Sequence, residues 1–296
     1  IKELASRRSA VIQEVEKLRR RQNEIATLLR GKTEADQRQS LVREGKELKP
    51  RIADLETHLR EIESSLREEQ SKIPNLTHPE APFGEGDHDN REIKTVGEIP
   101  RFTFTPKDHV KLGEELDLID FTGGAKVAGQ SFYFLKKDAV LLDFALCQYA
   151  LHLLMDEGFT PHITPDVARS EILEGTGYIP RGEETQIYSI AGRDLCLIAT
   201  AEITLGGLYS NEIIPEDRLP LKLAGISHCF RTEAGAYGRA SRGLYRVHQF
   251  NKVEMFIYCA PEDSDRQLDH MVALEERIFS GLGIPYRVVD CCTGDL

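Results

Sequence analysis

Apolar residues recur with a seven-residue period along residues 1–73, with charged residues between them. The repeated positions are Leu4, Val11, Leu18 and Ile25, followed by Leu41, Leu48, Leu55 and Ile62. Gly31 separates the two series and is typical of a helix end. Two heptad helices joined by a few residues fold back on each other. We therefore predict an N-terminal antiparallel coiled-coil helical hairpin over residues 1–73.

The pattern changes after Ile73. Residues 74–106 are rich in proline and glycine, which predicts a linker without regular structure. Residues 135–157 carry apolar side chains at helical spacing and predict a buried helix. The proline-punctuated residues 158–165 then suit a strand at a sheet edge or an interface. Residues 195–202 follow as a strand that runs into a helix.

Two strand-like runs flank a glycine-rich loop, as in a β-hairpin. The runs are residues 223–233 and 245–258. Side chains alternate between the faces of a strand, so Arg231 and Glu233 share one face of the first strand. Phe250 and Glu254 likewise share a face of the second. If the two faces coincide, a guanidinium, two carboxylates and a phenyl ring converge. The loop could close over a phosphate chain through Gly235, Gly238, Arg239, Arg242 and Gly243.

These four side chains suit the binding of a nucleotide and an amine. The guanidinium of Arg231 can hold a phosphate with two parallel hydrogen bonds. Phe250 offers a flat apolar face on which a purine can stack, and Glu254 can hold an ammonium group. An ordinary amphipathic hairpin with solvated charges has the same pattern. The residues alone leave both interpretations open.

Charge is distributed unevenly along the 296 residues, whose formal net charge is −11. Residues 1–73 carry 17 Lys and Arg against 14 Asp and Glu, a net charge of +3, so the remainder carries −14. The whole chain is therefore not a basic nucleic-acid binder, but its N-terminal arm is mildly basic. The cluster Arg19, Arg20 and Arg21 predicts contact with an RNA phosphate backbone. A purely structural coiled coil remains the alternative.

Six cysteines lie mostly in apolar runs, without the spacing of a zinc site. A reducing compartment is the simplest interpretation, so we expect a cytoplasmic protein, with an organellar matrix as the alternative. No apolar run reaches the roughly 20 residues that span a membrane, so we expect no membrane partner.

The hairpin segment FRTEAGAYGRASRGLYRVHQFNKVEMF resembles motif 2 of class II aminoacyl-tRNA synthetases in the seryl-tRNA synthetase version. The resemblance extends over essentially the whole chain, and it implies an α+β fold. In that fold the coiled-coil arm precedes an antiparallel sheet flanked by helices. Residues 158–165 and the helix before them resemble motif 1, which implies a homodimer interface. The chain reaches Leu296 before any motif 3, so the C-terminal part of the catalytic domain would lie beyond it. We therefore expect residues 1–296 by themselves to show no serine-dependent pyrophosphate exchange.

The resemblance implies that the protein activates L-serine with ATP and Mg²⁺ and transfers the seryl group to tRNA(Ser), with tRNA(Sec) as a further acceptor. It implies an arm over residues 1–73 that binds tRNA, a linker over 74–106 and a catalytic domain over 107–296. It implies catalytic roles for Arg231 and Glu233. It implies that serine is held by Thr200, Ala201, Glu202, Arg231 and Glu254. It implies that ATP is held by Arg231, Thr232, Glu233, Arg246, Val247 and Phe250.

Other interpretations remain at this point. The segment Thr200-Ala201-Glu202 is in most proteins only a helix cap. The chain could be a catalytically inactive paralogue, a related ligase that loads a carrier protein, or an RNA-binding coiled-coil protein without enzymatic activity. No residues of this chain are expected to form a dedicated metal site.

Overall fold

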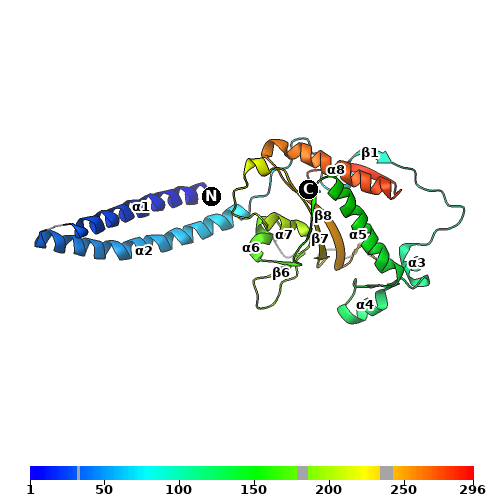
Figure 1. The fold of residues 1–296 in the computed structure, drawn as a ribbon, viewed down its shortest axis with the longest axis horizontal. Coiled ribbons are helices and arrows are strands. Elements are labelled where there is room, and N and C mark those ends of the chain that lie inside the picture. Colours follow the sequence, from blue (N-terminus) through cyan, green and yellow to red (C-terminus); the bar gives the residue numbers. More distant parts are fainter. Residues whose placement is uncertain (32–33, 179–185, 234–242) are drawn as a thin grey trace. The chain divides into compact units, whose positions relative to one another are not determined.

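The computed structural model describes residues 1–31, 34–178, 186–233 and 243–296. The chain divides into two compact units, Ile1–Ala81 and Pro82–Leu296 (Figure 1). The first unit is a helical hairpin, and the second is a body of strands and helices. The predicted α+β class, with an N-terminal helical hairpin, is confirmed.

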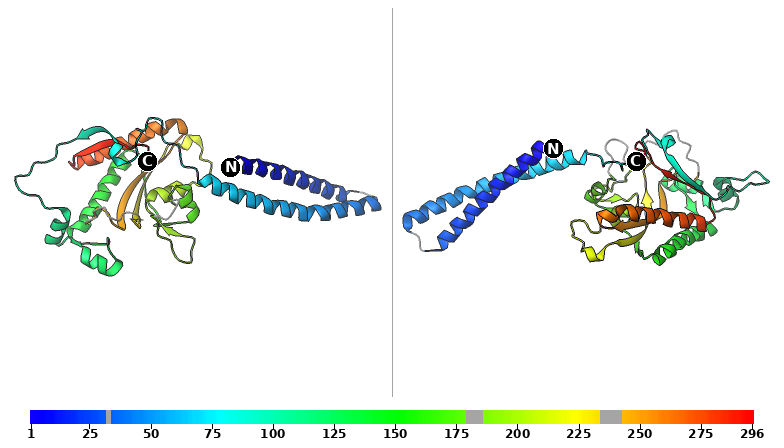
Figure 2. Two further views of the ribbon diagram at one scale, coloured as in Figure 1. Left: turned by 180° about the vertical axis from the view of Figure 1, so that it is seen from behind. Right: turned by 90° about the horizontal axis from the view of Figure 1, so that it is seen from above.

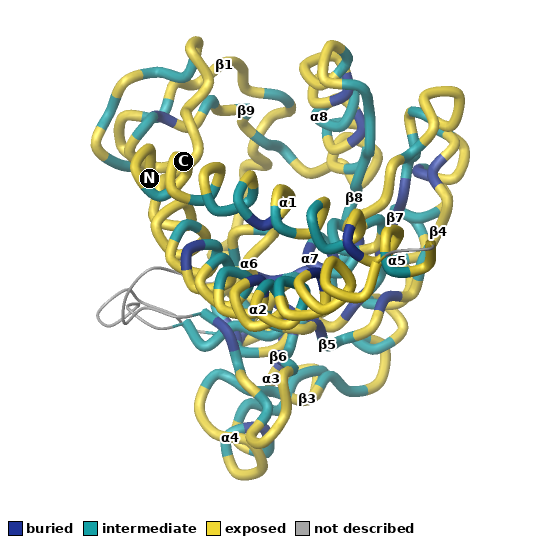
Figure 3. The backbone as a smooth tube through the Cα atoms, turned by 90° about the vertical axis from the view of Figure 1, so that its left-hand side faces the viewer, coloured by how far each residue is buried: buried dark blue, intermediate teal, exposed yellow. Residues whose placement is uncertain are grey.

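The first unit consists of helices α1 (Lys2–Arg30) and α2 (Ala35–Ser71), which run antiparallel (Figure 2). Apolar residues are buried between them at a few positions in each helix (Figure 3). These residues are Val15, Ile25, Leu41, Ile52 and Ile62. Ion pairs flank this seam, with Arg8 bonded to Glu63 at 2.9 Å and Arg51 to Glu14 at 2.7 Å. The coiled-coil hairpin that the heptads predicted is therefore confirmed.

The second unit contains both helices and strands. Its helices are α3 (His109–Glu115), α4 (Phe121–Ala128), α5 (Asp138–Asp156), α6 (Ser170–Gly175), α7 (Ala201–Gly207) and α8 (Ser264–Gly281). Its strands are β1 (Arg91–Val96), β2 (Ile119–Asp120), β3 (Phe134–Leu135), β4 (Thr160–Ile163), β5 (Val167–Ala168), β6 (Cys196–Leu197), β7 (Leu221–Phe230), β8 (Gln249–Tyr258) and β9 (Tyr286–Asp290). Short 3-10 helices lie at Asp87–Asp89, Glu216–Arg218 and Pro261–Asp263.

The central sheet has the order β4-β7-β8, with β4 at an edge as predicted. Strands β7 and β8 are antiparallel, whereas β4 runs parallel to β7, so this sheet is mixed and not purely antiparallel as predicted. Helices α5 and α8 pack on one face through Leu154 and Leu274, which meet Ala224 of β7. Helix α7 packs on the other face through Ala201 and Leu205 (Figure 1). The sheet therefore lies between two helical layers.

Helix α5 differs from the buried helix that its apolar spacing predicted. Leu154 is 1% exposed against the sheet, but Leu141, Leu142 and Phe144 are each at least 60% exposed. By length and composition alone α5 could cross a membrane, although its stretch contains Asp143 and packs on the sheet. The prediction of a buried helix is wrong for the single chain, because only one side of α5 meets the body. Apolar periodicity indicates that a face is covered, but not by what.

The predicted absence of regular structure in residues 74–106 is also partly wrong. Strand β1 lies inside this range and pairs antiparallel with β9, in a register that aligns Val96 with Tyr286. A local excess of proline and glycine predicts breaks in structure. It carries no information about a partner strand almost 200 residues away along the chain.

Candidate active site

One face of β8 carries Phe250, Lys252 and Glu254 at alternate positions. Their register partners on β7 are Cys229, Ser227 and Gly225. These partners are small, so they leave space above the sheet. Cys229 is fully buried, and burial raises the pKa of its thiol, so this cysteine stays protonated.

Gly225 lets helix α7 lie close to this face. A Cβ at this position would meet the Cβ of Ala201 and a Cδ of Leu205, each at 2.9 Å. A larger residue would therefore push α7 off the sheet. The close approach puts the start of α7 beside Glu254, and it explains why two segments 50 residues apart form one site.

Thr200 connects the two segments. It is the N-cap of α7, where its hydroxyl oxygen accepts a hydrogen bond from the backbone N–H of Glu202 at 3.2 Å. The same hydroxyl donates to Glu254 at 2.7 Å, and Thr200 is fully buried. Thr200 is therefore a helix cap, as the alternative interpretation predicted, and it also holds the carboxylate of Glu254 in place. Lys252 forms an ion pair with the same carboxylate.

Tyr178 fixes the second carboxylate of the site. Its hydroxyl donates to Glu202 at 2.6 Å. Burial, and then the bond to Glu202, raise the pKa of the Tyr178 phenol well above its usual range, so it remains a donor at neutral pH. The side chains of Glu202 and Glu254 are thus each oriented by a neutral hydroxyl.

Arg231 lies just beyond the end of β7, with its guanidinium 5.2 Å from the centre of the Phe250 ring. The two predicted faces therefore coincide. Glu233 has a left-handed backbone with φ +53°, which is uncommon outside glycine. It pairs with Arg246 at 3.4 Å, and both side chains are largely buried. The predicted strands ran through these residues, but β7 ends at Phe230 and β8 begins at Gln249, because the chain turns at Glu233.

Two hollows of about 350 Å³ each meet at Arg231 and Glu233. The first is lined by Gly177, Tyr178, Gln186, Ala199, Arg231 and Glu233. The second is lined by Arg231, Glu233, Leu244, Tyr245, Arg246, Val247 and Phe250. One guanidinium and one carboxylate therefore face both spaces.

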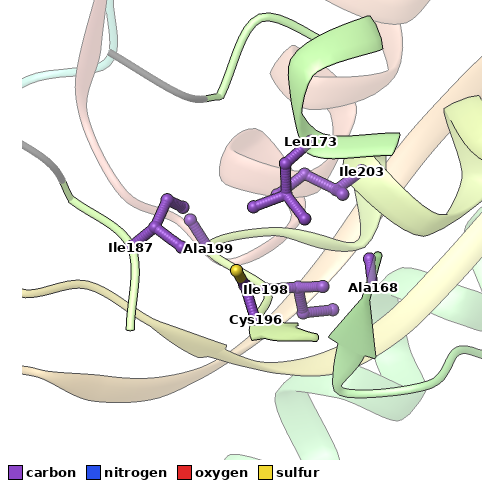
Figure 4. Close-up of a cluster of buried hydrophobic side chains, with 7 residues drawn as sticks. All are labelled: Ala168, Leu173, Ile187, Cys196, Ile198, Ala199 and Ile203. Carbon is purple, nitrogen blue, oxygen red and sulfur yellow. The ribbon is translucent and has the colours of Figure 1, made fainter. Parts of the chain in front are cut away.

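A small core adjoins the first hollow, and Figure 4 shows its side chains. It consists of Ala168, Leu173, Ile187, Cys196, Ile198, Ala199 and Ile203. Ala199 belongs to both the core and the hollow, so the wall of the site is part of a packed interior. Such support holds a site rigid.

The structure brings together nearly all the body residues that the sequence predicted for the site. Thr200, Ala201, Glu202 and Glu254 lie at the contact of α7 with β8, and Arg231, Glu233, Arg246, Val247 and Phe250 surround the second hollow. Thr232 joins them through its backbone N–H, which donates to the carbonyl of Gln186 at 3.1 Å. The predicted loop residues Gly235, Gly238, Arg239 and Arg242 lie outside the described residues.

Sequence reasoning missed Tyr178 and Gln186, and it gave Lys252 no role. Lys252 shares the period-two face of Phe250 and Glu254, so the spacing could have found it. Tyr178 stands in an irregular stretch, without any such signal.

Comparison with known proteins relates both units to one family. A family profile described as the seryl-tRNA synthetase N-terminal domain matches residues 1–77, and one described as the tRNA synthetase class II core domain (G, H, P, S and T) matches residues 187–296. The serine–tRNA ligase of Treponema denticola is 54% identical over 99% of this chain and 70% of its own length. That of Rubrobacter xylanophilus is 57% identical over 99% of this chain and 69% of its own.

The chain belongs to the seryl-tRNA synthetase family. It is thus an aminoacyl-tRNA synthetase of class II, as motif 2 indicated. A seryl-tRNA synthetase from Pyrococcus horikoshii, solved in complex with ATP, has a TM-score of 0.81 and 36% identity, covering 99% of this chain and 70% of its own. A cytoplasmic serine–tRNA ligase from Naegleria fowleri, solved with AMP, has a TM-score of 0.76 and 28% identity, covering 99% and 68%.

The three arginines that were predicted to bind RNA, Arg19, Arg20 and Arg21, differ in their contacts. Arg21 makes two bonds to Glu44 of α2, at 2.7 and 2.9 Å, and Arg19 bonds to Glu56 of α2 at 2.7 Å. Arg20 is exposed on α1. Two of the three predicted RNA-binding residues therefore also tie the arm together.

Proposed function

We propose that this protein activates L-serine with ATP to give seryl-adenylate, and that it transfers the seryl group to tRNA(Ser). A serine carboxylate oxygen attacks the α-phosphorus of ATP. A phosphorus–oxygen bond forms there, and the bond to the leaving pyrophosphate breaks. The observation that carries the proposal is the pair of hollows that share Arg231 and Glu233.

The second hollow suits ATP. Phe250 offers a face for the adenine, beside the buried Val247, and Arg246 and Arg231 offer positive charge to the phosphates. The relative from Pyrococcus horikoshii is complexed with ATP, which supports ATP as a substrate. Phosphoryl and nucleotidyl transfer depend mainly on positioning and charge neutralisation. Arg231 and Glu233 are our candidates for the catalytic residues.

The first hollow suits serine. Its wall includes Ala199, which precedes Thr200, and Tyr178, which is bonded to Glu202. Thr200, Ala201 and Glu202 therefore lie beside this hollow at the start of α7, next to Glu254, and the two carboxylates can hold an ammonium group and a hydroxyl. Arg231 lies between the hollows, where it can meet the carboxylate of serine as it approaches ATP. Small polar substrates are selected by such fixed hydrogen-bond partners, because a wrong substrate leaves them unpaired.

Mg²⁺ fits this site as a companion of ATP. Within the described ranges, no group of three or more His, Cys, Asp or Glu could hold a metal ion. Mg²⁺ commonly uses one or two carboxylates together with substrate phosphates, and Glu233 supplies one carboxylate at the second hollow. The ion would neutralise phosphate charge when bound.

The arm is proposed to hold the tRNA, with Arg19, Arg20 and Arg21 near the RNA backbone. The match of residues 1–77 to the family's N-terminal domain supports this role. The acceptor would be tRNA(Ser), with tRNA(Sec) as a second substrate.

We further propose a homodimer through the motif 1 region, which is α5 and β4. The exposed apolar residues Leu141, Leu142 and Phe144 are a surface that a second subunit would cover. This proposal also accounts for the apolar character of α5 without a membrane. All six cysteines, each in a described part of the chain, are free, which supports a cytoplasmic location.

Serine-dependent exchange of radioactive pyrophosphate into ATP tests the proposal, with an enzyme that includes any residues following Leu296. We expect exchange with L-serine far above that with glycine or L-threonine, and serylation of tRNA(Ser) by the same protein. A catalytically inactive paralogue, or an RNA-binding coiled-coil protein, would bind tRNA and show no exchange.

A further inference from the structure

Both backbone polar groups of Arg231 are bonded to one residue, His248. The N–H of Arg231 donates to the backbone carbonyl of His248 at 3.0 Å. The carbonyl of Arg231 lies 2.8 Å from Nδ1 of the His248 ring. One histidine therefore holds the peptide groups on either side of the Arg231 Cα, from which the guanidinium reaches into both hollows.

The His248 ring is itself held from several sides. The ring of Phe132 stacks on it, with centroids 5.2 Å apart and planes 22° apart. The hydroxyl of Tyr188 lies 2.9 Å from Nδ1. The backbone N–H of His248 donates to the carbonyl of Ser131 at 3.2 Å. The imidazole thus has little freedom to turn away from Arg231.

The contacts at Nδ1 decide where the ring carries its proton. A carbonyl oxygen can only accept a hydrogen bond, so Nδ1 at 2.8 Å from the Arg231 carbonyl must carry hydrogen. A lone pair there would face the carbonyl lone pairs. The phenolic oxygen of Tyr188 then accepts from the same N–H. Burial, and the charge of Glu233, raise the pKa of this phenol, so Tyr188 remains neutral.

Arg231 lies beyond the regular ladder, where its backbone is held by single bonds: its N–H and carbonyl bond to His248, and the N–H of Thr232 bonds to Gln186. Strand β7 ends at Phe230, and Glu233 turns the chain with a left-handed φ of +53°. The ladder of β7 with β8 therefore does not extend beyond the Phe230–Gln249 pair. A displacement of about 1 Å at a charged group that acts in the transition state can cost about a hundredfold in rate.

We propose that His248 is a positioning residue for Arg231, which it holds through the Nδ1 hydrogen bond to the Arg231 carbonyl. His248 touches neither hollow in this proposal and acts only through Arg231. The proposal rests on the proposed function, in which Arg231 serves both substrates.

The test compares His248→Asn, His248→Gln and His248→Ala in serine-dependent pyrophosphate exchange. The asparagine amide places an N–H donor near the position of Nδ1, whereas glutamine places it one bond further out. We expect kcat to fall about a hundredfold in the alanine and glutamine variants and by only about threefold in the asparagine variant, with smaller changes in KM. A merely structural role would not separate asparagine from glutamine in this way.

Two further variants complete the test. His228→Asn changes a histidine on the opposite face of the same hairpin, where it bonds Asp166 at 2.8 Å, and exchange should be unchanged. Tyr188→Phe removes only an acceptor, so kcat should stay within about threefold. This variant also decides the matter if the His248 variants fail to fold, which thermal melting would reveal. A large loss in Tyr188→Phe would mean that Tyr188 donates to Nδ1, and would refute the proposed bond.

Two results would overturn the inference directly. In one, His248→Asn falls as far as His248→Gln; in the other, His248→Ala keeps wild-type kcat. Failure of the proposed function gives a different result, because the unsubstituted enzyme, including any residues that follow Leu296, would then show no serine-dependent exchange.

Discussion

Replacing Glu254 by glutamine should selectively damage the use of serine. Glu254 accepts a hydrogen bond from the buried Thr200 and pairs with Lys252, and its side chain is 21% exposed. Glutamine keeps nearly the same shape and can still accept from Thr200. It removes the charge that would hold the ammonium group of serine, and it leaves Lys252 without its partner. The change therefore tests charge at this position while shape is kept.

The expected loss in kcat/KM for serine follows from how deeply the Glu254 carboxylate is buried where it would pair with the ammonium group of serine. Breaking a fully buried ion pair costs about 3–5 kcal/mol, and a largely exposed one about 1 kcal/mol or less. For a side chain that keeps about a fifth of its exposure, we expect about 2–3 kcal/mol. At 1.4 kcal/mol for each factor of ten, kcat/KM for serine should fall about 30- to 150-fold. The KM for ATP should change by less than about threefold.

Pyrophosphate exchange at varied serine and varied ATP measures both constants. Glu276→Gln is a matched control. Glu276 also pairs with a lysine, Lys94 at 2.8 Å, and its side chain is likewise 21% exposed. It lies on α8, which packs on the other face of the sheet from α7, whereas Glu254 is bonded to Thr200 at the start of α7. We expect this control to keep both constants near those of the unsubstituted enzyme.

The reasoning would be refuted if Glu254→Gln kept its kcat/KM for serine within about threefold, because Glu254 would then not face the substrate. A rise in the KM for ATP as large as the fall in kcat/KM for serine would point instead to general damage of the site. If Glu276→Gln behaved like Glu254→Gln, loss of any glutamate–lysine pair in the body would explain both results.

Further predictions concern the arm and the wall of the second hollow. Arg21→Ala removes two bonds to Glu44 and should lower the melting temperature followed by circular dichroism, whereas Arg20→Ala should leave melting unchanged and weaken tRNA binding. If Arg20→Ala lowered the melting temperature and Arg21→Ala did not, the assigned roles of the two arginines would be wrong. Each lost phosphate contact should also reduce the slope of log K for tRNA binding against log salt concentration by about 0.7–0.9. Arg21 lowers the pKa of Glu44 below its ordinary 4.5. The stabilisation from this pair is therefore present above pH 4.5 and is lost as the pH falls through the lowered pKa. The difference in melting temperature between the enzyme and Arg21→Ala should accordingly shrink in acid. Gly243 precedes Leu244, which lines the second hollow, and Gly243→Ala puts a methyl group against Nε2 of His109 at a backbone φ of +77°. The KM for ATP in exchange should therefore rise about tenfold, and an unchanged KM would show that this wall does not meet ATP.

The hairpin with its converging side chains was predictable because its signals are local. Period-two alternation placed Phe250 and Glu254 on one face, and the register of β7 with β8 extends that face to Arg231. The seven-residue period likewise predicted the arm. Motif 2 then identified the family, because a long segment of fixed residues is far more specific than any single periodicity. The individual roles of the site residues stay predictions.

Contacts between segments that are distant along the chain could not be predicted from the sequence. Nothing near Tyr178 indicates that its hydroxyl meets Glu202, and nothing in residues 91–96 indicates pairing with β9. Composition around β1 pointed the other way, because proline and glycine influence only the backbone next to them. The exposed side of α5 was not predicted for the same reason, since the spacing of apolar residues does not say which neighbour covers each side of a helix.

The sequence by itself determined which residue types share a face along each helix and strand, because backbone geometry fixes the period of the side chains. Only the tertiary structure decided which faces meet. Gly225 allows α7 to lie on the sheet, so that Thr200 can bond to Glu254. The bonds of His248 to the backbone of Arg231 arise in the same way, where the chain leaves β7 and returns to β8. Packing of whole elements makes such contacts, and no local pattern encodes it.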